Sequence, residues 1–258
     1  MKKIINDKDR LVEDMLSGYA KAFSDRVTVL DERILLRKHK KDNDKVAVII
    51  GNGSGHEPGM IDLVGYGLFD ANVCGNIFTA PTPIDMMKAI KAVQTDKGVL
   101  ILVSSHQGDI LNAKMAVMLA KAEGINAKMV VLWDDISSAP KNDMSERRGS
   151  VGLYYSFKIV TSAAESGMDM ESLIALAQNV RDNSRSLSVA VSSGTHPQTG
   201  LKTFELKDDE IEIGMGVHGE AGSGVRKLCS SKELVSYMMG ALVDDLELKS
   251  GDQFMALV

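Results

Sequence analysis

The sequence has few of the residues that mark secreted or membrane-spanning proteins. Its 258 residues include two cysteines and five prolines. Cys74 and Cys229 lie far apart and match neither C-x-x-C nor a zinc-binding spacing, which is typical of a protein from a reducing compartment. No apolar run approaches the ~18 residues that span a bilayer, and the N-terminal segment lacks the apolar core of a signal peptide. We therefore expect a soluble, cytoplasmic protein.

Net charge and motif content argue against two further classes of protein. A net charge of −5 gives no electrostatic reason for direct binding to nucleic acid. The pattern G-x-x-x-x-G-K-[ST] is absent, so the chain has no Walker-type nucleotide site, and no cofactor is predicted. With 44% hydrophobic and 25% charged residues, the composition is that of an ordinary globular protein with one large domain or two small ones.

Continuous apolar runs alternate with helical patterns along the chain. Buried strands are predicted at 46–50, 99–103, 127–133 and 186–191, and shorter strands at 27–30 and 34–37. A first helix is expected from a cap at Asn6 or Asp7 to about Phe23, and further helices at 83–95, 110–123, 151–167, 170–181 and 231–245. This alternation predicts an α/β fold with a mainly parallel sheet and flanking helices. Segment 203–214 has the pattern of a hairpin around an acidic turn. The last residues predict a turn and then a strand, or a chain whose C-terminal segment is missing.

Polar loops follow three of the predicted strands, at the place where ligands collect in such sheets. They are "GNGSGHEPGM" (51–60), "SSHQGD" (104–109) and "WDD" (133–135). The first loop matches neither G-x-G-x-x-G nor G-x-S-x-G. A second glycine cluster, "GMGVHGEAGSG" (214–224), formally contains G-x-G-x-x-G, but more glycine follows it instead of a helix. Both clusters contain a histidine close to glycine and glutamate, His56 in the first and His218 in the second.

The residues alone leave several interpretations of these two histidines open. Glycines at tight turns need no ligand, and the histidines can be structural. Together with Asp109 they can bind zinc or iron, but the chain has no H-x-H or H-x-x-x-H spacing, so no metal is predicted. The third interpretation is a polar ligand held against bare backbone, with an accessible imidazole beside it.

Five segments taken together resemble the dihydroxyacetone-binding subunit of bacterial dihydroxyacetone kinases. They are "GNGSGHEPGM", "CGNIFTAPTP", "GDILN", "ERRGSVG" and "IEIGMGVHGEAG", and they occur in family order along nearly the whole chain. The resemblance implies a homodimer of mainly α/β fold. It divides this chain into a first domain at 1–185 and the start of a second, smaller domain at 186–258, and it implies a chain that continues beyond Val258.

The resemblance also implies the roles of four residues. His218 matches the family's covalent histidine, whose Nε2 adds to the ketone of dihydroxyacetone and forms a hemiaminal. Gly53 matches a backbone contact to the substrate, and His56 and Asp109 match the pair that holds its hydroxyls. In the kinase, Asp109 would accept the proton of the hydroxyl being phosphorylated, and His56 would help to polarise the carbonyl. Phosphate comes from a separate subunit that carries ADP and is rephosphorylated by a sugar-phosphotransferase protein.

One loop departs from the family's pattern. Active kinase subunits typically have "KNYTGD" where this chain has "SSHQGD", so Ser104 replaces a lysine and His106 a tyrosine. Loss of a cation beside the arriving phosphate puts phosphoryl transfer in doubt. Operons of this glycerol-metabolism pathway can encode a paralogue that binds dihydroxyacetone and co-activates a helix-turn-helix regulator. We therefore predict first such a sensor and co-activator, and as the alternative an active substrate-binding kinase subunit.

Overall fold

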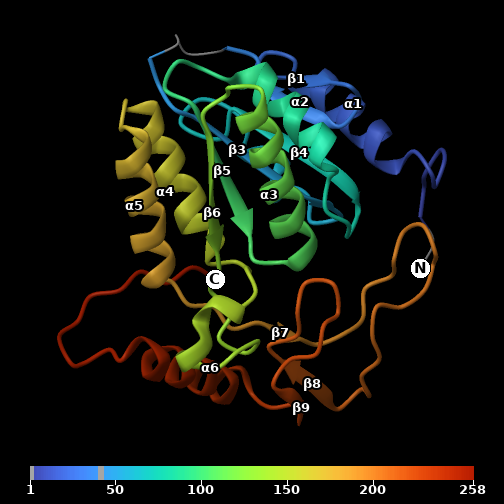
Figure 1. The fold of residues 1–258 in the computed structure, drawn as a ribbon. Helices are drawn as coiled ribbons and strands as arrows, with labels where there is room; N and C mark the ends of the chain where they lie inside the picture. The colour runs from blue at the N-terminus through green and yellow to red at the C-terminus, as the bar shows by residue number, and fades with distance from the viewer. Residues whose placement is uncertain (1–2, 40–43) are drawn as a thin grey trace.

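The larger sheet of the protein has six strands and is mainly parallel (Figure 1). The computed structural model describes residues 3–39 and 44–258. The strand order is β1 (Val27–Leu30), β2 (Ile34–Arg37), β4 (Ala71–Ile77), β3 (Ala47–Ser54), β5 (Val99–Ser104), β6 (Ala127–Leu132). Strands β4, β3, β5 and β6 run parallel, and β1 and β2 add an antiparallel edge. The predicted α/β fold is therefore confirmed.

Helices cover both faces of this sheet, which explains the continuous apolar runs in its two central strands β3 and β5. Val48 and Ile50 of β3 pack in the core that contains α1 (Leu11–Ala22), α4 (Leu153–Glu165) and α5 (Met170–Asp182). Ala47 and Ile49 pack on the opposite face, against α2 (Pro83–Val93) and α3 (Gln107–Ala122). Figure 1 shows α4 and α5 side by side at one flank, with α3 on the other side of β5 and β6. Successive side chains of β3 therefore belong alternately to the two hydrophobic cores on opposite faces of the sheet.

A smaller antiparallel sheet and the last helix lie below the first sheet in Figure 1. Its strands are β7 (Val189–Ala190), β8 (Glu210–Ile213) and β9 (Gly224–Lys227). Helix α6 (Ser231–Leu246) begins with a capping box of Ser230 and Glu233 and packs its apolar side chains on Ile211 and Ile213 of β8. Short 3-10 helices, η1 (Ile61–Leu63) and η2 (Lys141–Glu146), follow β3 and β6. Among the described residues, no helix combines the length and apolarity needed to cross a bilayer.

Four details of the predicted strands are wrong. The strand expected at 186–191, buried on both faces, is reduced to β7, whose two half-buried residues pair antiparallel with β8. The sequence pattern missed β4, a central strand, because Asn72, Gly75 and Asn76 interrupt its apolar run. The hairpin expected within 203–214 does not form, since β8 pairs with β7 and β9 and residues 203–206 are in no strand. The strand expected at the end is also absent, because residues 252–258 have no regular structure. The errors at 203–214 and at the end of the chain concern pairing partners, which the local alternation of residues does not specify.

A buried cluster of four charges joins the edge of the sheet to α4. The Glu165 carboxylate accepts hydrogen bonds from Arg37 at 2.6 Å and from Lys45 at 3.1 Å, and Asp70 pairs with the same two cations. Burial acts to raise the pKa of Glu165, but the hydrogen bonds from Arg37 and Lys45 outweigh it and lower the pKa to about 2. Glu165 is therefore ionised at neutral pH and faces the two cations of the cluster.

Candidate functional site

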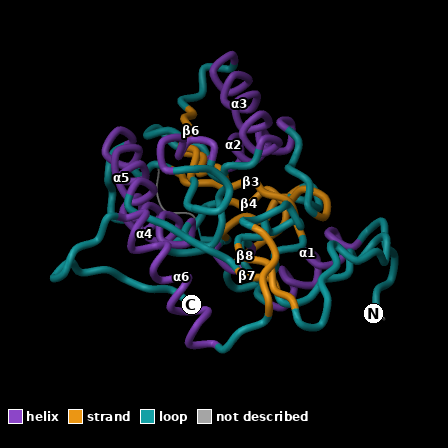
Figure 2. The backbone as a smooth tube through the Cα atoms, turned by 90° about the horizontal axis from the view of Figure 1, so that it is seen from below, coloured by secondary structure: helices purple, strands orange, loops and turns teal. Residues whose placement is uncertain are grey.

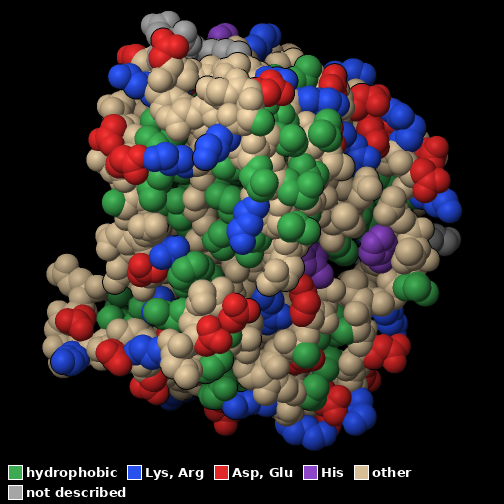
Figure 3. Space-filling view, in the orientation of Figure 1, with side chains coloured by type: hydrophobic (Ala, Val, Ile, Leu, Met, Phe, Trp, Pro, Cys, Tyr) green, Lys and Arg blue, Asp and Glu red, His purple; other side chains and the backbone are tan. Residues whose placement is uncertain are grey.

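The two glycine clusters of the sequence meet in space. His56 lies in the loop after β3 and His218 in the loop after β8, and their Nε2 atoms are 3.0 Å apart although 162 positions separate the residues. Figure 2 views the molecule from below, so the small sheet and α6 face the viewer. In Figure 3, histidine side chains reach the surface above the small sheet. The structure thus brings these two predicted site residues into direct contact at the carboxyl ends of the parallel strands.

Glycine is required in the first loop because the loop after β4 packs against it. A Cβ atom at Gly53 would lie 2.7 Å from the backbone nitrogen of Thr79, closer than real contacts allow. Gly55 has φ +107°, a conformation that side chains strongly disfavour. The glycines therefore let Phe78 approach the chain beside His56, which accounts for the composition of this loop without reference to a ligand.

Phe78 is a site residue that the sequence reasoning missed. Its ring centroid lies 5.3 Å from that of His56, 5.3 Å from that of His218 and 5.5 Å from that of His196. It has φ +56°, unusual for a residue with a side chain. Burial, and then the nearby histidines, lower the pKa of His56 to about 4, so this imidazole is neutral near pH 7. Phe78 lies in the segment "CGNIFTAPTP", and nothing in that segment indicates an aromatic contact to the histidines.

Glu220 orients the ring of His218. One carboxylate oxygen lies 2.9 Å from His218 Nδ1, and the other accepts a hydrogen bond of 2.9 Å from the His218 backbone nitrogen. Burial acts to raise the pKa of Glu220, but the bonds with His218 outweigh it and lower the pKa to about 2. A carboxylate only accepts, so in neutral His218 the proton sits on Nδ1 and Nε2 holds the lone pair. It follows that His56 Nε2–H donates to His218 Nε2.

The loop after β5 brings His106 and Asp109 to the same place. His106 precedes α3, its ring centroid is 5.2 Å from that of His218, and its Nδ1 lies 2.9 Å from Ser104 Oγ. Asp109 is in the first turn of α3, and its buried Oδ1 has no hydrogen-bond partner among the described residues. Burial raises the pKa of Asp109 to about 7, and the charge of His218 opposes this shift. Asp109 is therefore a carboxyl group whose proton can come and go near neutral pH.

The third candidate loop, "WDD", supports the site and does not enter it. Asp134 accepts hydrogen bonds from the backbone nitrogens of Ser150 at 2.6 Å and Gly152 at 2.8 Å, just before α4. Asp135 pairs with Arg148, whose guanidinium also donates to Gly214 O at 2.9 Å. These bonds hold the start of the second glycine cluster. Arg148 is in addition a cation close enough to His106 to act on its pKa.

The described residues include one group that could hold a metal ion. It consists of His106, His218 and Glu220, whose ligand atoms lie within 4.8 Å of one another. The set differs from the combination of His56, His218 and Asp109 that the sequence suggested as a metal alternative. The combination expected from the sequence includes neither Glu220 nor His106, although Glu220 follows His218 by two residues in the second glycine cluster.

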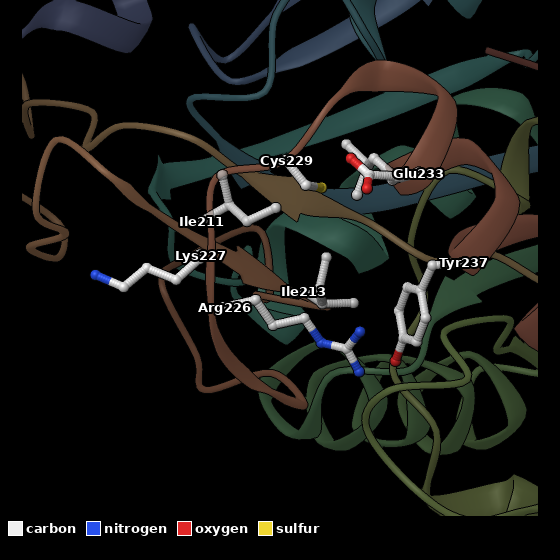
Figure 4. A pocket seen from close by; sticks show the side chains of 8 residues that line it. Ile211, Ile213, Arg226, Lys227, Cys229, Glu233 and Tyr237 are labelled. Atoms are coloured by element: carbon white, nitrogen blue, oxygen red, sulfur yellow. The ribbon is translucent and has the colours of Figure 1, made fainter.

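A separate hollow of about 250 Å³ lies between the small sheet and the start of α6 (Figure 4). Its walls include Ile211, Ile213 and Cys229, and the Arg226 guanidinium stacks 3.7 Å from the centre of the Tyr237 ring. None of the histidines lines it. The hollow is therefore distinct from the histidine site.

The site of this α/β protein thus combines two imidazoles, those of His56 and His218, with the buried carboxyl group of Asp109. Residues 17–258 match the Dak1 domain family, and the chain belongs to that family. The family predicted from the five motifs is thereby confirmed.

Three known proteins illustrate what this chain is similar to. The dihydroxyacetone-binding subunit of PTS-dependent dihydroxyacetone kinase 1 from Listeria innocua serovar 6a is 38% identical over 100% of this chain and 78% of its own length. The native dihydroxyacetone kinase of C. freundii has a TM-score of 0.88 and 34% identity over 95% of this chain and 45% of that one. A dihydroxyacetone kinase operon co-activator has a TM-score of 0.85 and 30% identity over 91% of this chain and 72% of that one. Two of the three are thus kinases or kinase subunits.

Proposed function

We propose that this chain binds dihydroxyacetone covalently through His218 and acts as the dihydroxyacetone-binding subunit of a phosphotransferase-dependent kinase. The observation that carries the proposal is the geometry of His218. Its Nδ1 is held by Glu220, so the Nε2 lone pair points to the place where His56 Nε2 now lies, 3.0 Å away. A ketone that enters between the two imidazoles meets a nucleophile on one side and a hydrogen-bond donor on the other.

The addition step follows from this arrangement. The Nε2 lone pair of His218 forms a bond to the carbonyl carbon, the C=O π pair moves to oxygen, and that oxygen takes a proton from solvent water to become the hemiaminal hydroxyl, which leaves one positive charge on the His218 ring. His56 Nε2–H donates to the carbonyl oxygen as its charge develops. The imidazolium that results keeps its Nδ1–H against the ionised Glu220 carboxylate. Glycerol has no carbonyl group and cannot follow this route.

Asp109 supplies the remaining group needed for phosphoryl transfer. Its raised pKa of about 7 suits a base that accepts a proton from a substrate hydroxyl as that hydroxyl attacks phosphorus. Gly53 remains the proposed backbone contact to the substrate, and the ADP-bearing subunit would deliver the phosphate.

A histidine variant tests the covalent step. Dihydroxyacetone labelled at the carbonyl carbon should lose its ketone NMR signal and give a tetrahedral carbon signal on binding to wild type. His218→Asn should abolish that signal, and His196→Asn, a histidine that also contacts Phe78, should retain it. Labelled ligand that binds wild type and keeps its ketone signal would refute the covalent proposal.

The co-activator role is a second candidate, favoured by the loop after β5. Ser104 is only 6% exposed and its hydroxyl is engaged with His106, so a position where active subunits typically carry lysine holds no charge here. One reconstitution separates the candidates: the chain, the ADP-bearing subunit and the phosphotransferase proteins are mixed, and dihydroxyacetone phosphate is assayed. Sustained turnover supports the kinase, whereas binding without turnover supports the co-activator.

A further inference from the structure

His218 and two residues beside it, His106 and Glu220, have side chains of the types that bind metal ions. One ring nitrogen each of His106 and His218 and one oxygen of Glu220 lie within 4.8 Å of one another. In a zinc site each ligand atom lies roughly 2.0–2.2 Å from the metal, which places tetrahedral ligands about 3.3 Å apart. Side-chain rotations would have to close that difference, and all three residues lie in loops or at a helix start.

His106 has a ring nitrogen suited to bind a metal. Its Nε2 is buried and has no hydrogen-bond partner in the described part of the chain. Its Nδ1 lies 2.9 Å from Ser104 Oγ, and when Nδ1–H donates to this hydroxyl the lone pair is on Nε2. Histidine ligands usually donate their second N–H to such a partner, which fixes the tautomer and the ring. An unpaired buried Nε2 is costly without a partner, and a bound metal would provide one.

The donor set selects the class of metal. Two imidazoles and one carboxylate suit zinc and neighbouring transition metals, whereas magnesium and calcium prefer sites made of oxygen. We propose that His106, His218 and Glu220 bind a divalent transition metal of the zinc class, with a fourth position open to water or a small ligand. This goes beyond the proposed function, which uses neither His106 nor a metal.

A metal bound there would block the covalent step, and this consequence rests on the proposed function. A metal on Nε2 occupies the lone pair that attacks the ketone. A metal on Nδ1 takes the place of that proton, so neutral His218 carries its proton on Nε2 and again lacks the attacking lone pair. Either mode of binding therefore makes the metal and dihydroxyacetone mutually exclusive on His218.

Calorimetry with metal-free protein tests the site directly. We expect Zn²⁺ to bind wild type at one site per chain and to bind His106→Phe at least tenfold more weakly, since even partners outside the ligand set contribute roughly 10–100-fold to affinity. Glu220→Gln provides a second variant in case the first is unstable. His196→Phe is the matched control, because His196 contacts the same Phe78 ring and lies outside the set. Equal affinity of wild type and both ligand variants would overturn the proposal.

Competition then distinguishes failure of this site from failure of the proposed function. Saturating Zn²⁺ should remove the tetrahedral carbon signal of labelled dihydroxyacetone from wild type, and a chelator should restore it. A signal that persists at full Zn²⁺ occupancy refutes the exclusion. If metal-free protein never gives the signal but still binds Zn²⁺ through His106, the metal site stands and the covalent function fails.

Discussion

Replacing Glu220 by glutamine should weaken dihydroxyacetone binding while the fold is retained. The carboxylate presents two oxygens to two donors of His218, the backbone N–H and Nδ1–H, both at 2.9 Å. Glutamine has a single carbonyl oxygen, so its NH₂ group must face one of these donors. The substitution also removes the negative charge of Glu220, which stabilises the positively charged His218 ring of the hemiaminal. The variant therefore loses a charge-assisted bond and leaves one donor unpaired.

The size of the effect follows from the exposure of this pair. Hydrogen bonds to charged groups contribute about 1.5–3 kcal/mol. Because the Glu220 side chain is 37% exposed, water screens part of the interaction, and we take the lower part of that range. A loss of about 1.5–2 kcal/mol corresponds to roughly 10–30-fold weaker binding.

Calorimetric titration with dihydroxyacetone in metal-free buffer measures this difference. Glu205→Gln is the matched control, since the Glu205 side chain is 81% exposed and pairs with Lys202, three residues earlier in the chain. A thermal melt checks that both variants remain folded. Wild-type affinity in Glu220→Gln would show that the carboxylate does not support the adduct, and the tautomer argument for His218 would be wrong.

Three further predictions concern other parts of the molecule. Gly53→Ala should cost about 1–3 kcal/mol in a denaturant titration, because its Cβ would lie 2.7 Å from backbone; unchanged stability would mean that the loop moves freely. Glu165→Gln should cost about 3 kcal/mol at neutral pH, because Arg37 loses a buried partner. The Glu165 pKa is depressed, so its contribution is full above the unfolded value of 4.5 and lost as pH falls toward about 2; the difference between wild type and variant should shrink over that window in acid melts. Changing residues 104–107 to "KNYT" should raise turnover with the ADP-bearing subunit by about tenfold or more; no change would show that the missing cation at position 104 does not limit phosphoryl transfer.

Three residues of the candidate site could be identified from the sequence, because their immediate neighbours in the chain mark them as accessible polar groups. His56 and His218 each stand among glycines, and Asp109 follows a buried strand, so all three were candidates before their positions were known. Phe78, Glu220 and His106 were not assigned roles, because their importance depends on contacts to residues far along the chain. His106 was noted only as a departure from the family's loop. Its buried, unpaired Nε2 is a property of the folded protein alone.

The sequence by itself determined the α/β class, since buried parallel strands and amphipathic helices leave periodic patterns within 5–15 residues. It also determined which strands end in polar loops. Tertiary structure decided the strand order, in which β4 lies between β2 and β3, and the pairing of β8 with β9. It decided as well that two histidines 162 positions apart touch, with Glu220 selecting the tautomer of one of them. The physical reason is that strand pairing and ring contacts are long-range interactions, and only the packing of both sheets brings their partners together.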